Sequence, residues 1–425
     1  MMLIIRPFRG IIYNKDKVKD LSKVTAPPFD VISPYEQGRY YQSHPYNIIR
    51  IILGEEKEDD NEKENKYTRA ARYLKEWKDK GILKKEETPS IYVYEQEYFL
   101  EERKITRRGF VALMKLEDFN SGVIFPHEQV FPKPQKDRFN LMQNCLANLS
   151  AVFSLYRDPL CKVDEHLKEG EPLFELEDEK GVKHRLSAIR DKDTITKIAK
   201  LMRDKKILIA DGHHRYSTFL KLKEKLKRNS SLKEGWDYGM MYFLNAESGA
   251  ANILPVHRLI GSFTSEQLSQ FKSRIEQLFQ IKVLPFTSEN SSYQLRYMLQ
   301  QINLDDKFTL GMYQGDGAYY LLSLKETEKV SSGEVASAIV DNLIKRITRK
   351  EQLERGREID FTPYSDRAVS LVKKRKYQVA FFLKPICLEE IEKVAFSGRV
   401  MPSKSSYFYP KLLTGLVMRD ITDEI

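Results

Sequence analysis

The chain has 425 residues, enough for two or three domains of ordinary size. Hydrophobic residues make up 41% and charged residues 31%, a balance typical of folded globular proteins. No apolar run reaches the roughly 18 residues that a membrane-spanning helix needs, and the first residues lack a signal-peptide cleavage site. The three cysteines are scattered, which indicates a reducing compartment. We therefore expect a cytoplasmic protein without a membrane partner.

The formal net charge is +10, a surplus that is common in nucleic-acid-binding proteins. In this chain, however, lysine alternates with glutamate in most charged stretches, as in EEKEDDNEKENK. Such mixing is typical of solvated helix and loop surfaces. Nucleic acid is therefore compatible with the charge but is not the favoured partner.

The first third of the chain alternates strand and loop signals. MLIIRPFRGIIY, VTAPPFDVIS and YNIIRIIL are interpreted as extended segments, the second one held open by its two prolines. A helix is predicted over YTRAARYLKEWKDK, with a stop at Gly81. The stretch SIYVYEQEYFLEERKITRRGFVALMKLE then predicts a long β-hairpin.

The remaining two thirds mix helices and strands without strict alternation. A proline-rich loop is followed by the helix DRFNLMQNCLANL and the strand AVFSLY, and a β pair then turns at Lys180-Gly181. After the strands YGMMYFLNAE and ANILPVHRLI, a helix, a strand and a helix precede the hairpin FTLGMYQGDGAYYLLSL. This mixture predicts the α+β class, with domains at 1–118, 119–261 and 262–425.

The stretch ILIADGHHRYSTF places Asp-Gly-His-His-Arg where a strand passes into a helix. Free N–H groups at a helix start attract anions, and Gly212 would let a phosphate approach the backbone closely. Arg215 can grip the phosphate at two points, and His213 or His214 can bind the ligand or shuttle a proton. Asp211 is interpreted either as the helix cap or as a metal ligand or base. We interpret this corner as an anion-binding site, and it lacks the Lys-Ser/Thr ending of a Walker loop.

A proline-bounded loop, FPHEQVFPKPQKDRFNL, carries His127 and Glu128. A zinc-protease helix would need a second histidine that is missing here, so zinc is not expected. An imidazole and a carboxylate on a loop suit general-base catalysis and substrate positioning, whereas the structural alternative is a loop locked by a Glu–Arg pair. A second candidate base is Asp30, which would otherwise serve as a turn residue before SPYEQGRYY.

Two later segments set cations among apolar neighbours. In ILPVHRLI, Arg258 needs a partner, which a bound anion would supply. His257 beside it is interpreted as a hydrogen-bonded core residue. In VMPSKSSYFYPKLLTGLVM, Lys404, Ser405 and Lys411 lie near aromatic residues and are candidates for gripping a phosphate. The alternative for this segment is a packed terminal strand with exposed lysines.

Together, the segments resemble the family known as domain of unknown function 1015, over nearly the whole chain. The stretches that carry the resemblance are APPFDVIS, HEQV, KDRFNL, IADGHHRYSTF, LPVHRL and MPSKSSYFYPKLLTGLV. This ordered set is highly specific for the family and much less specific for an activity.

The corner alone is similar to the phosphate-binding corner of ParB-like and sulfiredoxin-like domains, among which free L-serine kinases carry a very similar Asp-Gly-His-His-Arg. The resemblance implies a nucleotide-binding core of that type with additional α+β segments. It implies that Gly212–Arg215 hold the phosphates of ATP or ADP with Mg²⁺, while a carboxylate activates the acceptor hydroxyl. Asp30 and Glu128 are the candidates for that carboxylate, and no residue is assigned as a metal ligand.

These observations predict a kinase that transfers a phosphoryl group from ATP or ADP to a small hydroxylated metabolite, with free L-serine as one acceptor. We expect the corner, Asp30, Glu128 and Lys404 to meet in one cleft. A ParB-like nucleic-acid-associated regulator or nuclease is the alternative from another class, and a non-catalytic nucleotide sensor is the third. The sequence gives no expectation for the oligomeric state.

Overall fold

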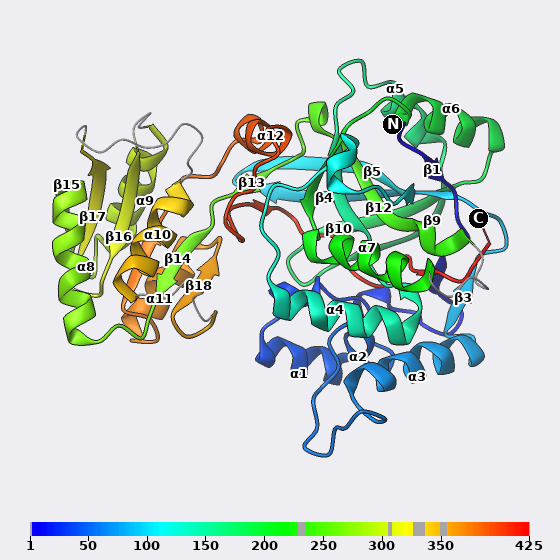
Figure 1. Cartoon of the computed structure of the whole chain (residues 1–425), viewed down its shortest axis with the longest axis horizontal. Coiled ribbons are helices and arrows are strands. Elements are labelled where there is room, and N and C mark those ends of the chain that lie inside the picture. Colours follow the sequence, from blue (N-terminus) through cyan, green and yellow to red (C-terminus); the bar gives the residue numbers. More distant parts are fainter. Residues whose placement is uncertain (1, 228–233, 305–307, 326–335, 349–354, 425) are drawn as a thin grey trace. The chain divides into compact units, whose positions relative to one another are not determined.

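The computed structural model describes residues 2–227, 234–304, 308–325, 336–348 and 355–424, and these residues form the predicted α+β fold (Figure 1). By their contacts they group into two compact units. Unit 1 is Met1–Pro126, Val130–Asn252 and Phe408–Ile425, and unit 2 is His127–Gln129 and Ile253–Tyr407. The domains expected at 1–118, 119–261 and 262–425 stay a prediction, and each unit is described by itself below.

Unit 1 is built on a nine-stranded sheet with the order β6-β11-β8-β12-β5-β4-β10-β9, and β1 pairs with β5. The predicted hairpin and the predicted β pair are both confirmed, as β4–β5 and β9–β10. The strands are β1 (Ile5–Arg6), β4 (Ile91–Leu100), β5 (Arg103–Lys115), β6 (Ile124–Phe125), β8 (Val152–Tyr156), β9 (Glu171–Glu177), β10 (Lys183–Ile189), β11 (Ile207–Asp211) and β12 (Tyr238–Asn245). Two further pairs of short strands in unit 1 lie outside this sheet: β2 (Ile11–Tyr13) pairs with β3 (Leu83–Lys85), and β7 (Ala147–Asn148) pairs with β21 (Arg419–Asp420).

The two faces of this sheet are covered differently. Phe110 and Ala112 of β5 face a core formed with α6 (Lys192–Met202) and α7 (His213–Lys227), whereas Arg107 on the same strand faces the other side, because side chains alternate along a strand. On that other side, Phe153 of β8 packs edge-on against Phe408, with ring centroids 5.6 Å apart. The C-terminal segment of unit 1 therefore crosses the face opposite to α6 and α7.

The helices predicted over YTRAARYLKEWKDK and DRFNLMQNCLANL are confirmed as α3 (Lys66–Asp79) and α4 (Pro132–Cys145) with shifted ends, and α4 begins at a proline, as helix starts favour. In contact terms α3 packs on α4, and α4 packs on α7 (Figure 1). The helices are α1 (Pro34–Ser43), α2 (Ile49–Ile52), α3 (Lys66–Asp79), α4 (Pro132–Cys145), α5 (Lys162–His166), α6 (Lys192–Met202) and α7 (His213–Lys227).

Two predictions of extended chain in unit 1 were wrong: VTAPPFDVIS forms the 3-10 turn Phe29–Val31 after its prolines, and YNIIRIIL contains the short helix α2. The side chain of Asn47 accepts the N–H of Ile49 and donates to the carbonyl oxygens of Lys23 and Thr25, at 2.9, 2.7 and 3.2 Å. These bonds start a helical turn there, and the isoleucines that suggested a buried strand are buried in the helix instead.

Unit 2 contains an antiparallel six-stranded sheet, ordered β15-β17-β16-β19-β14-β18. The strands are β14 (His257–Ile260), β15 (Phe279–Pro285), β16 (Thr309–Tyr313), β17 (Ala318–Leu324), β18 (Ile359–Thr362) and β19 (Val379–Phe382). The predicted hairpin over the Gly-Asp-Gly turn is confirmed as β16–β17. The unit also holds β13 (Ile253–Leu254) and α12 (Leu388–Phe396), and β20 (Tyr407–Phe408) lies where the two units meet in the sequence.

Helices cover both faces of the unit 2 sheet. Phe381 of β19 belongs to a core with α8 (Ser265–Leu278) and α10 (Ala336–Thr348). Its neighbour Phe382 belongs to a second core with α9 (Ser291–Leu304) and α11 (Ser365–Lys373). Because adjacent strand residues point to opposite faces, the sheet is the middle of three layers.

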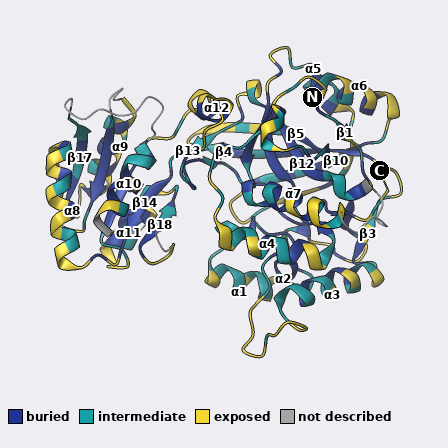
Figure 2. Cartoon of the chain, viewed as in Figure 1, coloured by how far each residue is buried: buried dark blue, intermediate teal, exposed yellow. Residues whose placement is uncertain are grey.

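Burial follows these layers, since the strands of both sheets are mostly buried and the outer sides of the helices are exposed (Figure 2). Within the described ranges, no helix is both long and apolar enough to cross a bilayer.

Candidate functional site

The Asp-Gly-His-His-Arg corner lies in unit 1, where β11 ends at Asp211 and α7 begins at His213. Gly212 between them has φ +96°, a conformation that strains any residue with a Cβ. A Cβ at this position would also lie 2.8–2.9 Å from the guanidinium group of Arg215. The space over Gly212, where we expected a phosphate to approach, is thus occupied by Arg215. A glycine is needed here because the turn requires a positive φ and because the side chain of Arg215 lies directly over this position.

Asp211 is the centre of a buried ion-pair cluster. Its Oδ2 accepts from Nη2 of Arg215 at 2.9 Å, and its Oδ1 accepts from Nζ of Lys411 at 2.5 Å. Arg215 also donates from Nη1 to Oγ of Ser150 at 3.1 Å and to the carbonyl oxygen of Ala151. The three charged side chains are only 10–17% exposed. Two cations are therefore fixed side by side at the start of α7.

The charges around Asp211 decide its protonation state. Burial raises the pKa of Asp211, and nearby Asp30 raises it as well, but the cations Lys411 and Arg215 outweigh both and hold the pKa below its ordinary value. Asp211 is therefore a fixed negative charge and a poor proton acceptor. Asp30, in the short 3-10 turn Phe29–Val31, lies close enough to act on Asp211 electrostatically and is half-buried.

The backbone that carries Lys411 is held by two side chains of the β4–β5 hairpin. Arg107 is fully buried and donates to the carbonyl oxygens of Tyr409, at 3.1 Å, and Pro410. Its Nε also donates to Oε1 of Gln96 at 3.1 Å, and Nε2 of Gln96 donates to the carbonyl oxygen of Lys411 at 3.0 Å. This buried pair therefore sets where the Lys411 ammonium group reaches the corner.

A second set of hydrogen bonds holds the same segment at Leu413, two residues after Lys411. Nε2 of His184 lies 3.2 Å from Oδ2 of Asp178, and Nδ1 of His184 lies 2.8 Å from the hydroxyl of Tyr94. If Asp178 accepts from Nε2, then Nδ1 accepts from Tyr94, whose hydroxyl oxygen accepts the N–H of Leu413 at 3.2 Å. Burial lowers the pKa of His184 despite its aspartate, which favours this neutral arrangement.

The two histidines of the corner, His213 and His214, have different surroundings. His213 is buried at the first turn of α7. Nε2 of His214 accepts the N–H of Phe131 at 3.0 Å, and the two rings stack with centroids 6.5 Å apart. Because Nε2 is an acceptor in this contact, His214 is neutral there and its proton is on Nδ1. The predicted roles of both residues at phosphate stay predictions.

Glu128 lies in unit 2, where it fastens a loop. Its carboxylate accepts three backbone N–H groups, those of Lys404, Ser405 and Ser406, at 3.0, 3.1 and 2.9 Å, and the Ser406 hydroxyl at 2.8 Å. Nε2 of His127 lies 2.7 Å from the same hydroxyl. A carboxylate that accepts four hydrogen bonds is stabilised in its ionised form and is a poor proton acceptor. Glu128 and His127 thus build the loop that presents Lys404.

Arg258 is fully buried in β14 of unit 2. Its Nη1 donates to the carbonyl oxygens of Val256 and Lys404 at 2.7 and 3.0 Å, and its Nε lies 3.3 Å from Oδ1 of Asp341 on α10. Beside it, the hydroxyl of Ser405 lies 3.0 Å from that of Ser337. Asp341 is therefore the protein partner that the sequence could not identify for Arg258.

The predicted site residues thus fall into one group per unit. Asp30, the 211–215 corner and Lys411 are in unit 1, and His127, Glu128, Arg258, Lys404 and Ser405 are in unit 2. Their meeting in one cleft stays a prediction. Sequence reasoning missed Arg107, Gln96 and Ser150, because each looks ordinary in its strand or loop and is recognised only through its partner.

Among the described residues, no group of three or more Asp, Glu, His or Cys side chains is placed to hold a metal ion. Mg²⁺ at nucleotides, however, is usually held by one or two carboxylates together with phosphate oxygens. Asp30 beside Asp211 offers donors of this type.

Comparison with known proteins places the sequence in a family. The sequence pattern described as "Protein of unknown function (DUF1015)" matches residues 5–347. No curated protein matches the chain by sequence.

Several solved structures are similar at low identity. A free serine kinase in complex with AMP shares 13% identity at a TM-score of 0.35, over 67% of this chain and 83% of that one. SbnI with a C-terminal truncation, from Staphylococcus aureus, shares 12% at a TM-score of 0.36, over 71% of this chain and 85% of that one. A conserved hypothetical protein from Pyrococcus furiosus shares 12% at 0.35, over 68% and 89%. Similarity at this level decides nothing about function, which has to be argued from the residues of the site.

Proposed function

Because the chain belongs to the family described as a protein of unknown function (DUF1015), which names no activity, we propose from the site itself that unit 1 is a nucleotide-dependent phosphotransferase. Its acceptor is a small hydroxylated molecule. The phosphoryl donor is ATP or ADP, as the resemblance of the corner to free L-serine kinases implies.

One observation carries this proposal: two buried cations, Arg215 and Lys411, converge on the start of α7. Phosphoryl transfer needs positioning and charge neutralisation more than covalent chemistry, and both cations are already fixed in place. The helix start adds backbone N–H groups without helical partners. Asp211 keeps the two cations oriented and balances part of their charge until a phosphate binds.

Asp30 is the base that this arrangement favours. Asp211 has a lowered pKa, and Glu128 already accepts four hydrogen bonds, so neither is suited to take a proton from an acceptor hydroxyl. Asp30 lies close enough to act electrostatically on Asp211, which places it beside the corner and its cations. Mg²⁺, held by Asp211 together with phosphate oxygens, would neutralise charge on the phosphates.

The test separates binding from turnover. ADP and ATP are titrated into the full-length protein by calorimetry, and transfer is followed by phosphorus NMR with Mg²⁺ and a mixture of hydroxylated metabolites. Asp30→Asn should keep the nucleotide affinity within about threefold and lower turnover by about a hundredfold or more. Asp20→Asn, at an exposed carboxylate that caps another 3-10 turn, is the matched control and should change neither.

Two results would contradict the proposal. Nucleotide binding without transfer to any acceptor would indicate a sensor. Salt-dependent DNA binding without nucleotide binding would indicate the nucleic-acid alternative.

A further inference from the structure

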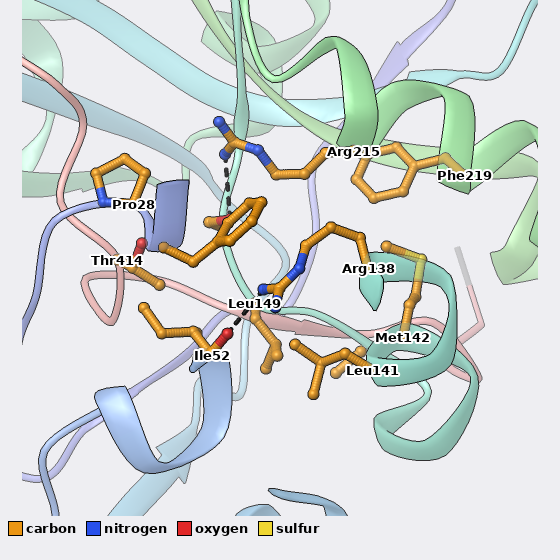
Figure 3. Close-up of a pocket in the computed structure, with 12 residues that line it drawn as sticks. Pro28, Ile52, Arg138, Leu141, Met142, Leu149, Arg215, Phe219 and Thr414 are labelled. Atoms are coloured by element: carbon orange, nitrogen blue, oxygen red, sulfur yellow. Dashed lines mark hydrogen bonds between the residues drawn. The ribbon is translucent and has the colours of Figure 1, made fainter. Parts of the chain in front are cut away.

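A pocket in unit 1 adjoins the corner and shares Arg215 with it (Figure 3). The cavity itself has a volume of about 40 Å³, and the open space at its mouth brings the total to about 490 Å³. Its walls come from the turn before Asp30, from α2, α4 and α7, and from the C-terminal segment. The lining residues are Pro28, Phe29, Ile52, Arg138, Leu141, Met142, Ala147, Leu149, Ser150, Arg215, Phe219 and Thr414. A ligand in this pocket therefore has one end next to the candidate base and the two cations.

Most of the pocket wall is apolar, but two arginines reach into it. Figure 3 shows the side chains of Arg215 and Arg138 extending from α7 and α4, with Leu141, Met142 and Phe219 on the same helices. Both arginines are more than nine-tenths buried, at 9% and 8% exposed. The lining residues include no aspartate or glutamate. Such a wall suits a molecule with an apolar body and an anionic group.

The guanidinium group of Arg138 is fixed before any ligand binds. It lies over the ring of Phe29 at 3.8 Å, donates from Nη1 to the carbonyl oxygen of Ile52 at 2.8 Å, and donates from Nε and Nη2 to Asp137. Within the described part of the chain, these bonds use three of the five N–H groups of a guanidinium. One N–H on each terminal nitrogen is left to donate to an anionic group of a ligand.

Positive charge is in excess on the Arg138 side of the pocket. The carboxylate of Asp137 is shared between Arg138 and Lys66, whose Nζ lies 3.0 Å away, and it also accepts the hydroxyl of Tyr67 at 2.9 Å. The other partner of Lys66, Glu56, is 77% exposed, so solvent screens its charge. At the corner, in contrast, both cations are already paired with Asp211 and are assigned to the nucleotide phosphates in the proposed function. The anionic end of a ligand is therefore drawn to Arg138 and its neutral hydroxyl end to the corner.

We propose that this pocket binds the phosphoryl acceptor, and that the acceptor is a small hydroxy acid with an apolar body. This inference rests on the proposed function and names its substrate class. An amino acid such as free serine fits less well, because no carboxylate lines the pocket to pair with its ammonium group, and because its short polar body leaves the apolar wall uncovered.

The test uses the full-length protein and calorimetric titration with hydroxy acids from glycolate to 2-hydroxyisocaproate and phenyllactate. We expect affinity to rise with the apolar body, and the methyl ester of 2-hydroxyisocaproate to bind about ten- to a hundredfold more weakly than the acid. L-serine should bind no better than the ester. Arg138→Gln should weaken the acid by the same factor, whereas Arg72→Gln, at an exposed arginine of α3, should not.

Because Arg138 also donates a hydrogen bond to the carbonyl oxygen of Ile52, Arg138→Gln can fail to fold. A second variant keeps the test valid in that case. Ala147→Leu adds volume to the pocket wall without changing charge and should also weaken binding of 2-hydroxyisocaproate. ADP is titrated separately into each variant and should bind with unchanged affinity. Hydroxy acid binding without nucleotide binding would refute the proposed function and leave the pocket assignment standing. Transfer to serine, or no binding by any member of the acid series, would overturn the pocket assignment.

Discussion

Gly212→Ala should perturb both the backbone turn of the corner and the position of the Arg215 guanidinium group. A residue with a Cβ at φ +96° is strained by about 1–2 kcal/mol. The new Cβ would also meet the Arg215 guanidinium at 2.8–2.9 Å, so that side chain must leave its present position. Moving it breaks the hydrogen bonds to Asp211 and Ser150, at 2.9 and 3.1 Å, and bonds to charged groups contribute about 1.5–3 kcal/mol each.

Gly249 provides the control for backbone strain alone. It is also in unit 1, its φ is +71°, and an added Cβ would find no atom within 4 Å. Gly249→Ala should therefore lower the free energy of unfolding by about 1 kcal/mol, and Gly212→Ala by at least about 1.5 kcal/mol more. The difference between the two variants isolates the displacement of Arg215.

Urea denaturation followed by tryptophan fluorescence suits this comparison. The chain has two tryptophans, Trp77 and Trp236, and both belong to unit 1, so the signal reports that unit. Equal losses in the two variants would refute the reasoning, because they would show that Arg215 moves away from Gly212 at no cost.

Three further predictions concern charged and titratable groups. Lys411→Met should lower the free energy of unfolding of unit 1 at pH 7 by about 3 kcal/mol in the same fluorescence assay, because it leaves Asp211 buried with one cation fewer. This loss of stability should be smaller when Lys411→Met is combined with Asp211→Asn. Burial lowers the pKa of His257 from 6.5 to about 3, so the unfolded state binds the proton more readily than the folded state does. The free energy of unfolding should therefore fall by about 1.4 kcal/mol for each pH unit of acidification between these two values. His257→Asn, which keeps an acceptor for the N–H of Leu383, should flatten that slope in calorimetric unfolding, and an unchanged slope would contradict the assignment. Glu128→Gln should speed amide hydrogen exchange at residues 404–406 by about tenfold or more, because a charged acceptor of three N–H groups becomes neutral.

Local patterns allowed much of the fold to be predicted. Two long strand-like runs joined by a charged turn identified the β4–β5 hairpin, and the apolar run before Asp211 with the helical pattern after it identified the corner. The segment around Ile49 misled, because isoleucines favour strands while the side-chain bonds of Asn47 that start a helix leave no periodic signal.

The site was less predictable because its geometry depends on contacts between distant residues. Lys411 was a candidate from its neighbours, but its pairing with Asp211, 200 residues away, is set by the fold. Arg107 gave no signal at all, since an arginine in an antiparallel strand is usually on a solvated face. Here that face is covered by the C-terminal segment, and the carbonyl groups that Arg107 bonds come from that segment.

The discontinuity of unit 1 has a consequence for biosynthesis. The sheet, the corner and Arg107 all precede residue 253, whereas Lys411 and the carbonyl groups that satisfy Arg107 follow residue 407. While a ribosome is still translating unit 2, Arg107 of the emerging unit 1 lacks its two carbonyl acceptors, and Asp211 has only one of its two cations. The corner therefore reaches its final charge balance only after the last stretch of unit 1 has left the exit tunnel. A ribosome that stops at residue 407 would release a chain containing every residue of the Asp-Gly-His-His-Arg motif but no completed site.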